Sequence, residues 1–286
     1  MTTLTIRHQT TYRYGEPVDL GPHRLMLRPR ESQELRLLSM EVTVVPAATI
    51  AWAQDVAGNT VATAIFQSKA DTLVITSVAT LELHAIPWPV FDVAASAISY
   101  PFAYSEDEAT DLGALAVPLH RDPSGRLSQW ATAFVLANPT DTLSLLKDIN
   151  AGVLAWVSYQ SRDNEGTQTP VHTLQRGWGS CRDLAVLFVE AVRTLGFGAR
   201  IVSGYLYDPT VALAGSAGPG TTHAWAEVYV PGAGWITFDP TNRSVGNVNL
   251  IPVAVGRDIR QVMPVEGSFV GMSNAFYGMW VEVSVK

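Results

Sequence analysis

The sequence has little cysteine, little charge and no long apolar run. Its 286 residues include one cysteine, Cys181, which excludes an internal disulfide and a cysteine-rich zinc site. Charged residues make up 16% and hydrophobic residues 47%, a balance typical of a chain that folds around a core. No apolar segment is long enough to cross a bilayer, and the N-terminus is too polar for a secretory signal. These features predict a soluble, cytoplasmic protein with no membrane partner.

The chain is acidic, with 19 Lys+Arg against 26 Asp+Glu and a formal net charge of −7. Because phosphate contacts need a clustered basic surface, this balance argues against a nucleic-acid partner. The sequence contains no internal repeat and no low-complexity tract. A chain of this length is expected to form one large or two modest domains.

The N-terminal part has the pattern of β-strands. Alternating or β-branched segments lie at 3–6, 38–45, 60–66 and 73–83, with turn residues between them. No helical period of more than about two turns competes with this pattern. We therefore predict an antiparallel β-sandwich domain over 1–125. The acidic run at 106–108 is interpreted as a solvated linker.

From about residue 140 the pattern changes to helices followed by strands. Apolar spacing predicts a helix over 141–160, with Asp141 as its N-cap, and a second helix over 180–195, which Gly196 ends. Further strands are predicted at 199–206, 223–230, 235–239 and 279–285. This order predicts an α+β protein in which 126–286 forms a core domain with a C-terminal strand.

The single thiol lies where the second helix begins. A thiol at a helix N-terminus experiences the positive end of the helix dipole, which favours the thiolate. The preceding Gly177 and Gly179 allow close approach of a substrate to the backbone. A free cysteine is more often a small buried hydrophobe. The glycines before Cys181 and the charged pair Arg182 and Asp183 after it weaken that reading, so we interpret Cys181 as a nucleophile.

A thiolate nucleophile needs a base, and the base needs an orienting group. His223 opens a strand after the Gly- and Ala-rich segment 207–222, where its side chain would face a cleft. The other histidines lie in β or loop stretches without a partner signal: His8, His23, His84, His120 and His172. Asp239 closes the next strand and is the candidate orienting carboxylate; its alternative role is to start a turn.

Strand parity restricts how these two side chains meet. Residues of one strand alternate between faces, so a direct pairing of His223 with Asp239 requires an odd-length loop or a bulge between the strands. We predict such a loop around Gly232 and Gly234, which glycine permits.

Several blocks together resemble the bacterial transglutaminase-like superfamily. The segments 179–185, 195–206, 223–235 and 238–242 occur in the family's order. Tyr12-Arg13-Tyr14, 25–29 and Gly256-Arg257-Asp258 are similar to the regions outside the core of bacterial members. The resemblance implies a papain-like core in which Cys181 is the nucleophile, His223 the base and acid, and Asp239 the orienting carboxylate.

The implied chemistry is acyl transfer on a peptide or protein substrate, without a cofactor. The Cys181 backbone amide is the first candidate oxyanion donor. Gln175 lies six residues before Cys181, the spacing of the oxyanion glutamine in papain-type enzymes, and the resemblance therefore implies it as the second. Trp178 and Trp225 are candidates for walling the site, with core packing as the alternative. Calcium-dependent members of the superfamily carry acidic loops, and we find neither such a cluster nor a metal site in this sequence.

Three functions remain open. The leading one is a cysteine hydrolase of peptide or isopeptide amide bonds, because the chain shows no evident domain for a second substrate. A transglutaminase, which joins a glutamine carboxamide to an amine, is the alternative within enzymes. A non-catalytic peptide-binding module is the alternative of another class. We expect 207–222 to gate the cleft; the β domain either positions substrate or forms an oligomer.

Overall fold

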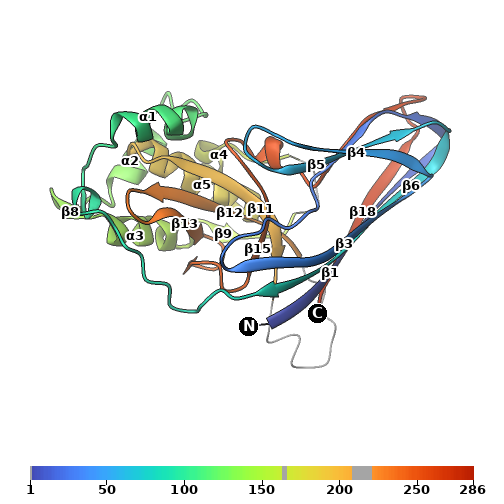
Figure 1. The fold of residues 1–286 in the computed structure, drawn as a ribbon. Helices are drawn as coiled ribbons and strands as arrows, with labels where there is room; N and C mark the ends of the chain where they lie inside the picture. The colour runs from blue at the N-terminus through green and yellow to red at the C-terminus, as the bar shows by residue number, and fades with distance from the viewer. Residues whose placement is uncertain (1, 163–165, 208–220) are drawn as a thin grey trace.

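The computed structural model describes residues 2–162, 166–207 and 221–286. A two-sheet β domain extends as an arm from a core of helices around a sheet (Figure 1). The sheets are antiparallel apart from one short parallel pair, so the predicted α+β class is confirmed. Most of the predicted gate, 207–222, falls on 208–220, which lie outside the described residues; 221 and 222 belong to a strand.

The β domain is a sandwich of two antiparallel sheets. One sheet has the order β17-β1-β6-β3, with β18 also paired to β1, and the other has the order β16-β2-β5-β4. The strands are β1 (Thr2–Leu20), β2 (His23–Leu25), β3 (Leu35–Val45), β4 (Ala48–Gln54), β5 (Thr60–Phe66), β6 (Ala70–Leu83), β16 (Val265–Glu266), β17 (Phe269–Val270) and β18 (Phe276–Val285). Alternating residues such as Leu73 and Ile75 of β6 and Ala62 and Ala64 of β5 form a shared core between the sheets.

The predicted division at residue 125 is wrong for the C-terminal segment, which returns to the β domain. β18 pairs with β1 from Ile6 opposite Val285 to Tyr14 opposite Phe276, while β16 and β17 pair with β2 and β1. The C-terminal strand therefore belongs to the β domain and not to the core, because β1 offers a full-length hydrogen-bonding edge there.

The core is built around a five-stranded sheet of order β14-β13-β12-β11-β15. Its strands are β11 (Ala199–Leu206), β12 (Thr221–Val230), β13 (Gly234–Asp239), β14 (Ser244–Val245) and β15 (Leu250–Gly256). Its helices are α1 (Glu106–Leu112), α2 (Arg126–Thr132), α3 (Thr142–Trp156), α4 (Pro170–Arg176) and α5 (Cys181–Thr194). Short elements complete the core: η1 (Ala95–Ala97), β7 (Ser99–Tyr100), η2 (Gly113–Ala116), β8 (Thr140–Asp141), β9 (Ser158–Tyr159), β10 (Trp178–Gly179) and η3 (Ile259–Val262).

Both predicted helices are present. The Asp141 carboxylate accepts from the backbone N–H of Ser144 and so caps α3, which ends four residues earlier than the predicted 160. Gly196 has φ of +91° after α5, a conformation that glycine adopts without strain. The acidic run at 106–108 is not a linker: it is the first turn of α1, where Ser105 and Glu108 form a capping box.

Two buried polar contacts join the β domain to the core sheet. His8 of β1 lies 3.1 Å from the Tyr205 hydroxyl of β11, and burial lowers the pKa of His8 to about 4. Asn59 exchanges two 2.8 Å hydrogen bonds with the backbone of Val255 in β15. The arm is therefore fixed to the sheet that carries the candidate site.

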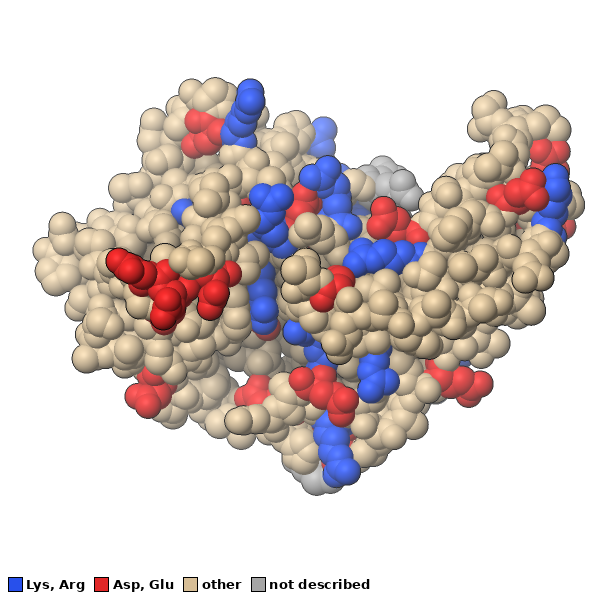
Figure 2. Space-filling view, turned by 45° about the horizontal axis from the view of Figure 1, so that its top comes forward, with Lys and Arg blue, Asp and Glu red and all other residues tan. Residues whose placement is uncertain are grey.

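On the face seen in Figure 2, basic side chains are interspersed with acidic ones.

Candidate active site

Cys181 is the first residue of α5, and a buried carboxylate fixes the turn before it. Ser180 is the N-cap residue; its backbone N–H and its hydroxyl both donate to the Asp183 carboxylate at 2.8 Å. The first helical hydrogen bond runs from the Leu184 N–H to the Ser180 carbonyl, so the Cys181 N–H has no intrahelical partner. The thiol is partly exposed beside the amide ends of the helix.

Asp183 also connects α5 to the segment before α4. It is fully buried and accepts from the backbone N–H of Gln168 at 2.6 Å and from the Arg162 guanidinium at 3.0 Å. The charge of Arg162 compensates for burying this carboxylate. Sequence reasoning gave Asp183 no role, although the Ser-x-x-Asp spacing of a capping box was a local signal for it.

His223 of β12 connects Cys181 to Asp239. The Nε2 atom of His223 lies 2.8 Å from Oδ2 of Asp239. The imidazole also hydrogen-bonds to the Cys181 thiol, which leaves Nδ1 as the ring nitrogen facing the sulfur. Trp225 stacks on the imidazole, with ring centroids 5.9 Å apart and 28° between the planes. These contacts hold the ring in one orientation.

The predicted odd-length connection is present. Val230 pairs with Gly234, so three residues join β12 to β13, and both Gly232 and Gly234 have positive φ. Because Ala226 lies opposite Phe238, Asp239 is level with Trp225 and not with His223. The expected direct pairing is therefore wrong, and the two side chains meet diagonally on one face of the sheet.

Asp239 is held by the turn that follows it. Its carboxylate accepts from the Thr241 backbone N–H at 2.9 Å and from the Asn242 side-chain amide at 2.6 Å. Asn242 was part of the resembling blocks but had no assigned role; its place three residues after Asp239, in the turn, is the signal that could have found it. These donors keep the carboxylate aimed at His223 and favour its charged form.

The protonation states of the three groups depend on one another. Burial alone would lower the pKa of His223, but the Asp239 and Cys181 contacts outweigh it and raise the pKa to about 9. Burial would raise the pKa of Cys181, but His223, the Ala224 N–H and Arg182 together lower it. Burial likewise opposes ionisation of Asp239, and the His223 contact lowers its pKa. The contacts between the three groups therefore favour the thiolate, imidazolium and carboxylate forms over the neutral ones.

The other predicted site residues differ in their surroundings. Gln175 is exposed on α4, and no hydrogen bond of its side chain is found in the described part of the chain. Trp178 is half-buried in β10 and stacks against Arg176 at 5.0 Å. Trp225 is fully buried in a cluster with Val202, Leu250 and Val255. Trp225 therefore supports His223 from behind and does not wall the cleft.

Tyr159 is a neighbour of the thiol that sequence reasoning missed. It lies in β9, where it pairs with Gly179 of β10 just before the nucleophile. Partial burial raises the pKa of Tyr159, and the charge of Cys181 raises it further. The two side chains are therefore close enough to interact electrostatically. The aromatic residue lies 22 positions before Cys181, so local spacing gave no signal for it.

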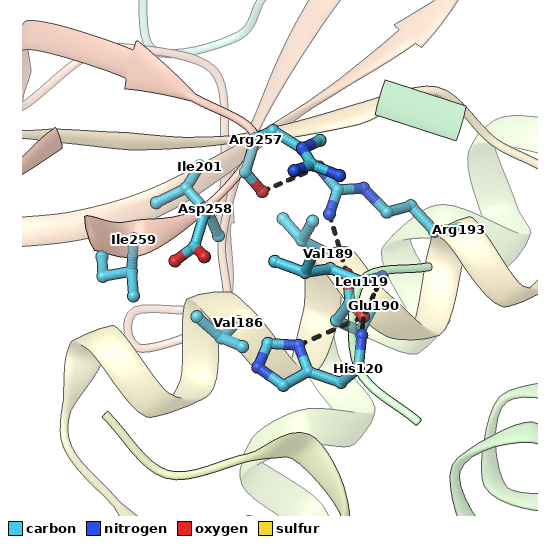
Figure 3. A pocket seen from close by; sticks show the side chains of 10 residues that line it. All are labelled: Leu119, His120, Val186, Val189, Glu190, Arg193, Ile201, Arg257, Asp258 and Ile259. Atoms are coloured by element: carbon cyan, nitrogen blue, oxygen red, sulfur yellow. Dashed lines mark hydrogen bonds and ion pairs between the residues drawn. The ribbon is translucent and has the colours of Figure 1, made fainter. Parts of the chain in front are cut away.

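A second buried polar cluster lies at the far end of α5 (Figure 3). The Glu190 carboxylate accepts from the backbone N–H groups of Leu119 and His120 and pairs with Arg193 at 2.8 Å. The His120 ring also faces it, at 3.2 Å, a partner that sequence reasoning did not find. At 1.5 Å per residue, Arg193 lies about 18 Å along the helix from Cys181. This cluster anchors the loop before α2 and is not part of the candidate site.

Over the ranges that the structure describes, no group of three or more His, Cys, Asp or Glu residues could hold a metal ion. Of the helices in those ranges, none is long and apolar enough to span a membrane.

Comparison with known proteins agrees with this architecture. Residues 4–82 match the model of the bacterial transglutaminase-like N-terminal region, and residues 128–240 match that of the transglutaminase-like superfamily. An uncharacterized protein of Mycobacterium tuberculosis is 28% identical over 287 residues, which span 92% of this chain and 86% of that protein. An uncharacterized protein of Mycobacterium leprae is 35% identical over 106 residues, 37% of each chain.

A solved structure shows the same fold along nearly the whole chain. A proposed cysteine protease from Cytophaga hutchinsonii superposes with a TM-score of 0.75 at 21% identity, covering 99% of this chain and 90% of that one. The chain belongs to the transglutaminase-like superfamily, with a bacterial transglutaminase-like N-terminal region followed by a papain-like core.

Proposed function

We propose that the protein is a thiol-dependent acyl-transfer enzyme that hydrolyses peptide or isopeptide amide bonds with Cys181, His223 and Asp239. The observation that carries this proposal is the hydrogen-bonded chain from the Cys181 thiol through His223 to Asp239. A module that only binds peptides has no need of all three groups, since a buried pair of imidazole and carboxylate adds little stability compared with apolar residues of similar volume.

The reaction follows from the positions of these groups. The Cys181 thiolate attacks the substrate carbonyl carbon, and the imidazolium of His223 gives its proton to the departing amine as the C–N bond breaks. The resulting thioester is attacked by water, from which neutral His223 takes a proton. The thiolate then leaves, and the carboxylic acid product is released. Asp239 keeps the imidazole oriented and stabilises its charged form in both steps.

The tetrahedral intermediates need donors for their oxyanion. The free N–H of Cys181 at the start of α5 is the first donor, and the helix dipole adds to it. We propose the Tyr159 hydroxyl as the second, because β9 pairs Tyr159 with Gly179, two residues before Cys181, and the charge of Cys181 contributes to raising the Tyr159 pKa. Gln175 remains the sequence-based alternative.

Transfer to an amine is the second candidate reaction. Tyr159 and the half-buried Trp178 are aromatic side chains on the paired strands β9 and β10, and β10 lies just before Cys181 in the chain. Such side chains can shield a thioester from water, and shielding favours an amine as the second reactant. A transglutaminase would use the same residues in the first step, so the acceptor alone separates the two reactions.

One experiment tests the proposal and separates the two reactions. Fluorescently labelled casein and dansylcadaverine would be supplied together to the wild type, Cys181→Ala and His223→Ala. Soluble fluorescent fragments that require both residues would indicate hydrolysis, and dansyl label on intact casein would indicate transfer. His172→Ala, which alters an exposed histidine on α4, is the matched control. Activity that survives Cys181→Ala would refute the proposal. The substrate's identity and the cytoplasmic location stay predictions.

A further inference from the structure

The C-terminal strand β18 exposes apolar side chains on both faces of its sheet. Tyr277 is 75% exposed, Trp280 and Val281 are 45% exposed, and Met279 is 37% exposed. No charged residue occurs from Gly267 to Val281 in a chain whose net charge is −7. Isolated exposed apolar residues are common on soluble proteins, but a contiguous group on one strand indicates an interaction surface.

One backbone edge of this strand is unpaired. Over the residues that the structure describes, β18 pairs with β1 alone. Thr5 and Lys286 exchange both backbone hydrogen bonds, so in this antiparallel register the even-numbered residues 278–286 direct their N–H and C=O groups toward β1. Met279 and Val281 therefore direct theirs outward. Natural sheet edges usually carry charges or proline at such positions, and this one carries neither.

We infer that β18 pairs antiparallel with β18 of a second copy of this chain, with Met279 of each copy opposite Val281 of the other. This register forms two hydrogen-bonded pairs, and four backbone hydrogen bonds, about a twofold axis at Trp280. The two sheets then continue into one across the dimer. On the inner face, Met279 and Val281 cover each other, and on the outer face the two Trp280 rings become neighbours.

Charge complementarity favours a second copy of this chain as the partner of β18, in the register that places Met279 opposite Val281. Arg13 of β1 lies opposite Gly278 and stacks over the Trp280 ring at 5.5 Å. Glu282 is exposed on the same outer face. With Met279 opposite Val281 of the second copy, Glu282 becomes level with Gly278 of that copy, beside its Arg13. Because Gly278 has no side chain, the carboxylate and the guanidinium can approach each other across it, once on each side of the axis.

The proposal is tested by measuring mass against concentration by sedimentation velocity. The wild type is expected to be a dimer of twice the 30.9 kDa chain mass. Arg13→Glu or Glu282→Arg alone should weaken dimerisation at least about tenfold, and the double variant should restore it, because the swapped charges meet again across the axis. Trp280→Glu should give a monomer, whereas the matched change Trp52→Glu on the exposed edge strand β4 should leave the dimer intact.

Circular dichroism and the alkylation rate of Cys181 would show that each variant is folded. A wild type that is monomeric at every concentration tested would overturn the proposal. A dimer that Trp280→Glu leaves intact, or that the charge swap fails to restore, would overturn it too. None of these readouts depends on catalysis, so the result is separate from that of the proposed function.

Discussion

Asp239→Asn tests how the site holds His223 protonated. Burial lowers the pKa of His223, but the hydrogen bond to Asp239 and the contact with Cys181 outweigh it. The net result is a pKa raised from 6.5 to about 9. At about 1.4 kcal/mol per pKa unit, this corresponds to about 3 kcal/mol in favour of the imidazolium. Replacing the carboxylate by an isosteric amide removes the charge, so the pKa of His223 should fall by about 1 to 2 units.

The same substitution alters which ring nitrogen carries the proton. An asparagine at 239 can present its N–H to Nε2 of His223, which places the proton of the neutral ring on Nδ1. Nδ1 is the nitrogen that faces Cys181, so the imidazole loses its ability to accept the thiol proton. We therefore expect kcat/KM on a peptide substrate to fall by about 10²- to 10⁴-fold.

The assay is kcat/KM measured from pH 5 to pH 10, with the pKa of His223 followed by NMR of the ring. Asp258→Asn, which changes a carboxylate at the N-cap of η3, is the matched control and should behave as the wild type. An unchanged imidazole pKa in Asp239→Asn, or a kcat/KM within about threefold of the wild type, would show that Asp239 does not control the protonation of His223.

Three further substitutions test the supporting structure. Gly204→Ala would drive a Cβ into the Ile251 carbonyl oxygen, so chemical denaturation should show a loss of about 2 to 4 kcal/mol. Gly15→Ala, whose Cβ would make an ordinary 3.9 Å contact with the Ala275 carbonyl oxygen, should lose under about 1 kcal/mol. Asp183→Ala leaves the half-buried Arg162 without its carboxylate partner and the buried N–H groups of Ser180 and Gln168 without an acceptor, so we expect about 2 to 4 kcal/mol of destabilisation; an unchanged Tm would contradict this role. Tyr159→Phe should lower kcat/KM by about 10- to 100-fold at unchanged stability, whereas Tyr277→Phe should have no effect; equal activity of both variants would remove Tyr159 from the oxyanion site.

Local signals made α5 and its surroundings predictable. The apolar residues Leu184, Leu187 and Ala191 repeat at the helical period. Gly196 adopts the positive φ that commonly ends a helix. The strand β11 occupies 199–206 as predicted, because its β-branched residues lie between a helix stop and a Gly-rich segment.

Short helices and distant pairings left no comparable signal. The helices α1, α2 and α4 have seven residues each, so packing and caps stabilise them more than periodicity does. The pairing of β18 with β1 joins the two ends of the chain, and a strand's sequence does not specify a partner so far away. The sequence alone therefore predicts the C-terminal strand as part of the core.

Within the candidate site, the sequence predicts the three proposed catalytic residues but few of the residues that support them. A helix start, a strand start and a strand end are positions from which side chains reach a cleft, and this favours Cys181, His223 and Asp239. For Trp225 the sequence leaves a wall of the cleft and core packing as alternatives, and only tertiary packing shows that the side chain is buried behind the His223 ring. Tyr159 depends on the parallel pairing of β9 with β10, which no local pattern indicates.

Alkylation by iodoacetamide from pH 4 to pH 9 measures whether His223 keeps Cys181 ionised at neutral pH. Because the chain has one cysteine, the incorporated label reports on that thiol alone. We predict a plateau of reactivity that begins well below the ordinary thiol range of about pH 8 to 9 and disappears in His223→Ala. Reactivity that rises only in the ordinary thiol range, and equally in both proteins, would contradict the thiolate–imidazolium pair.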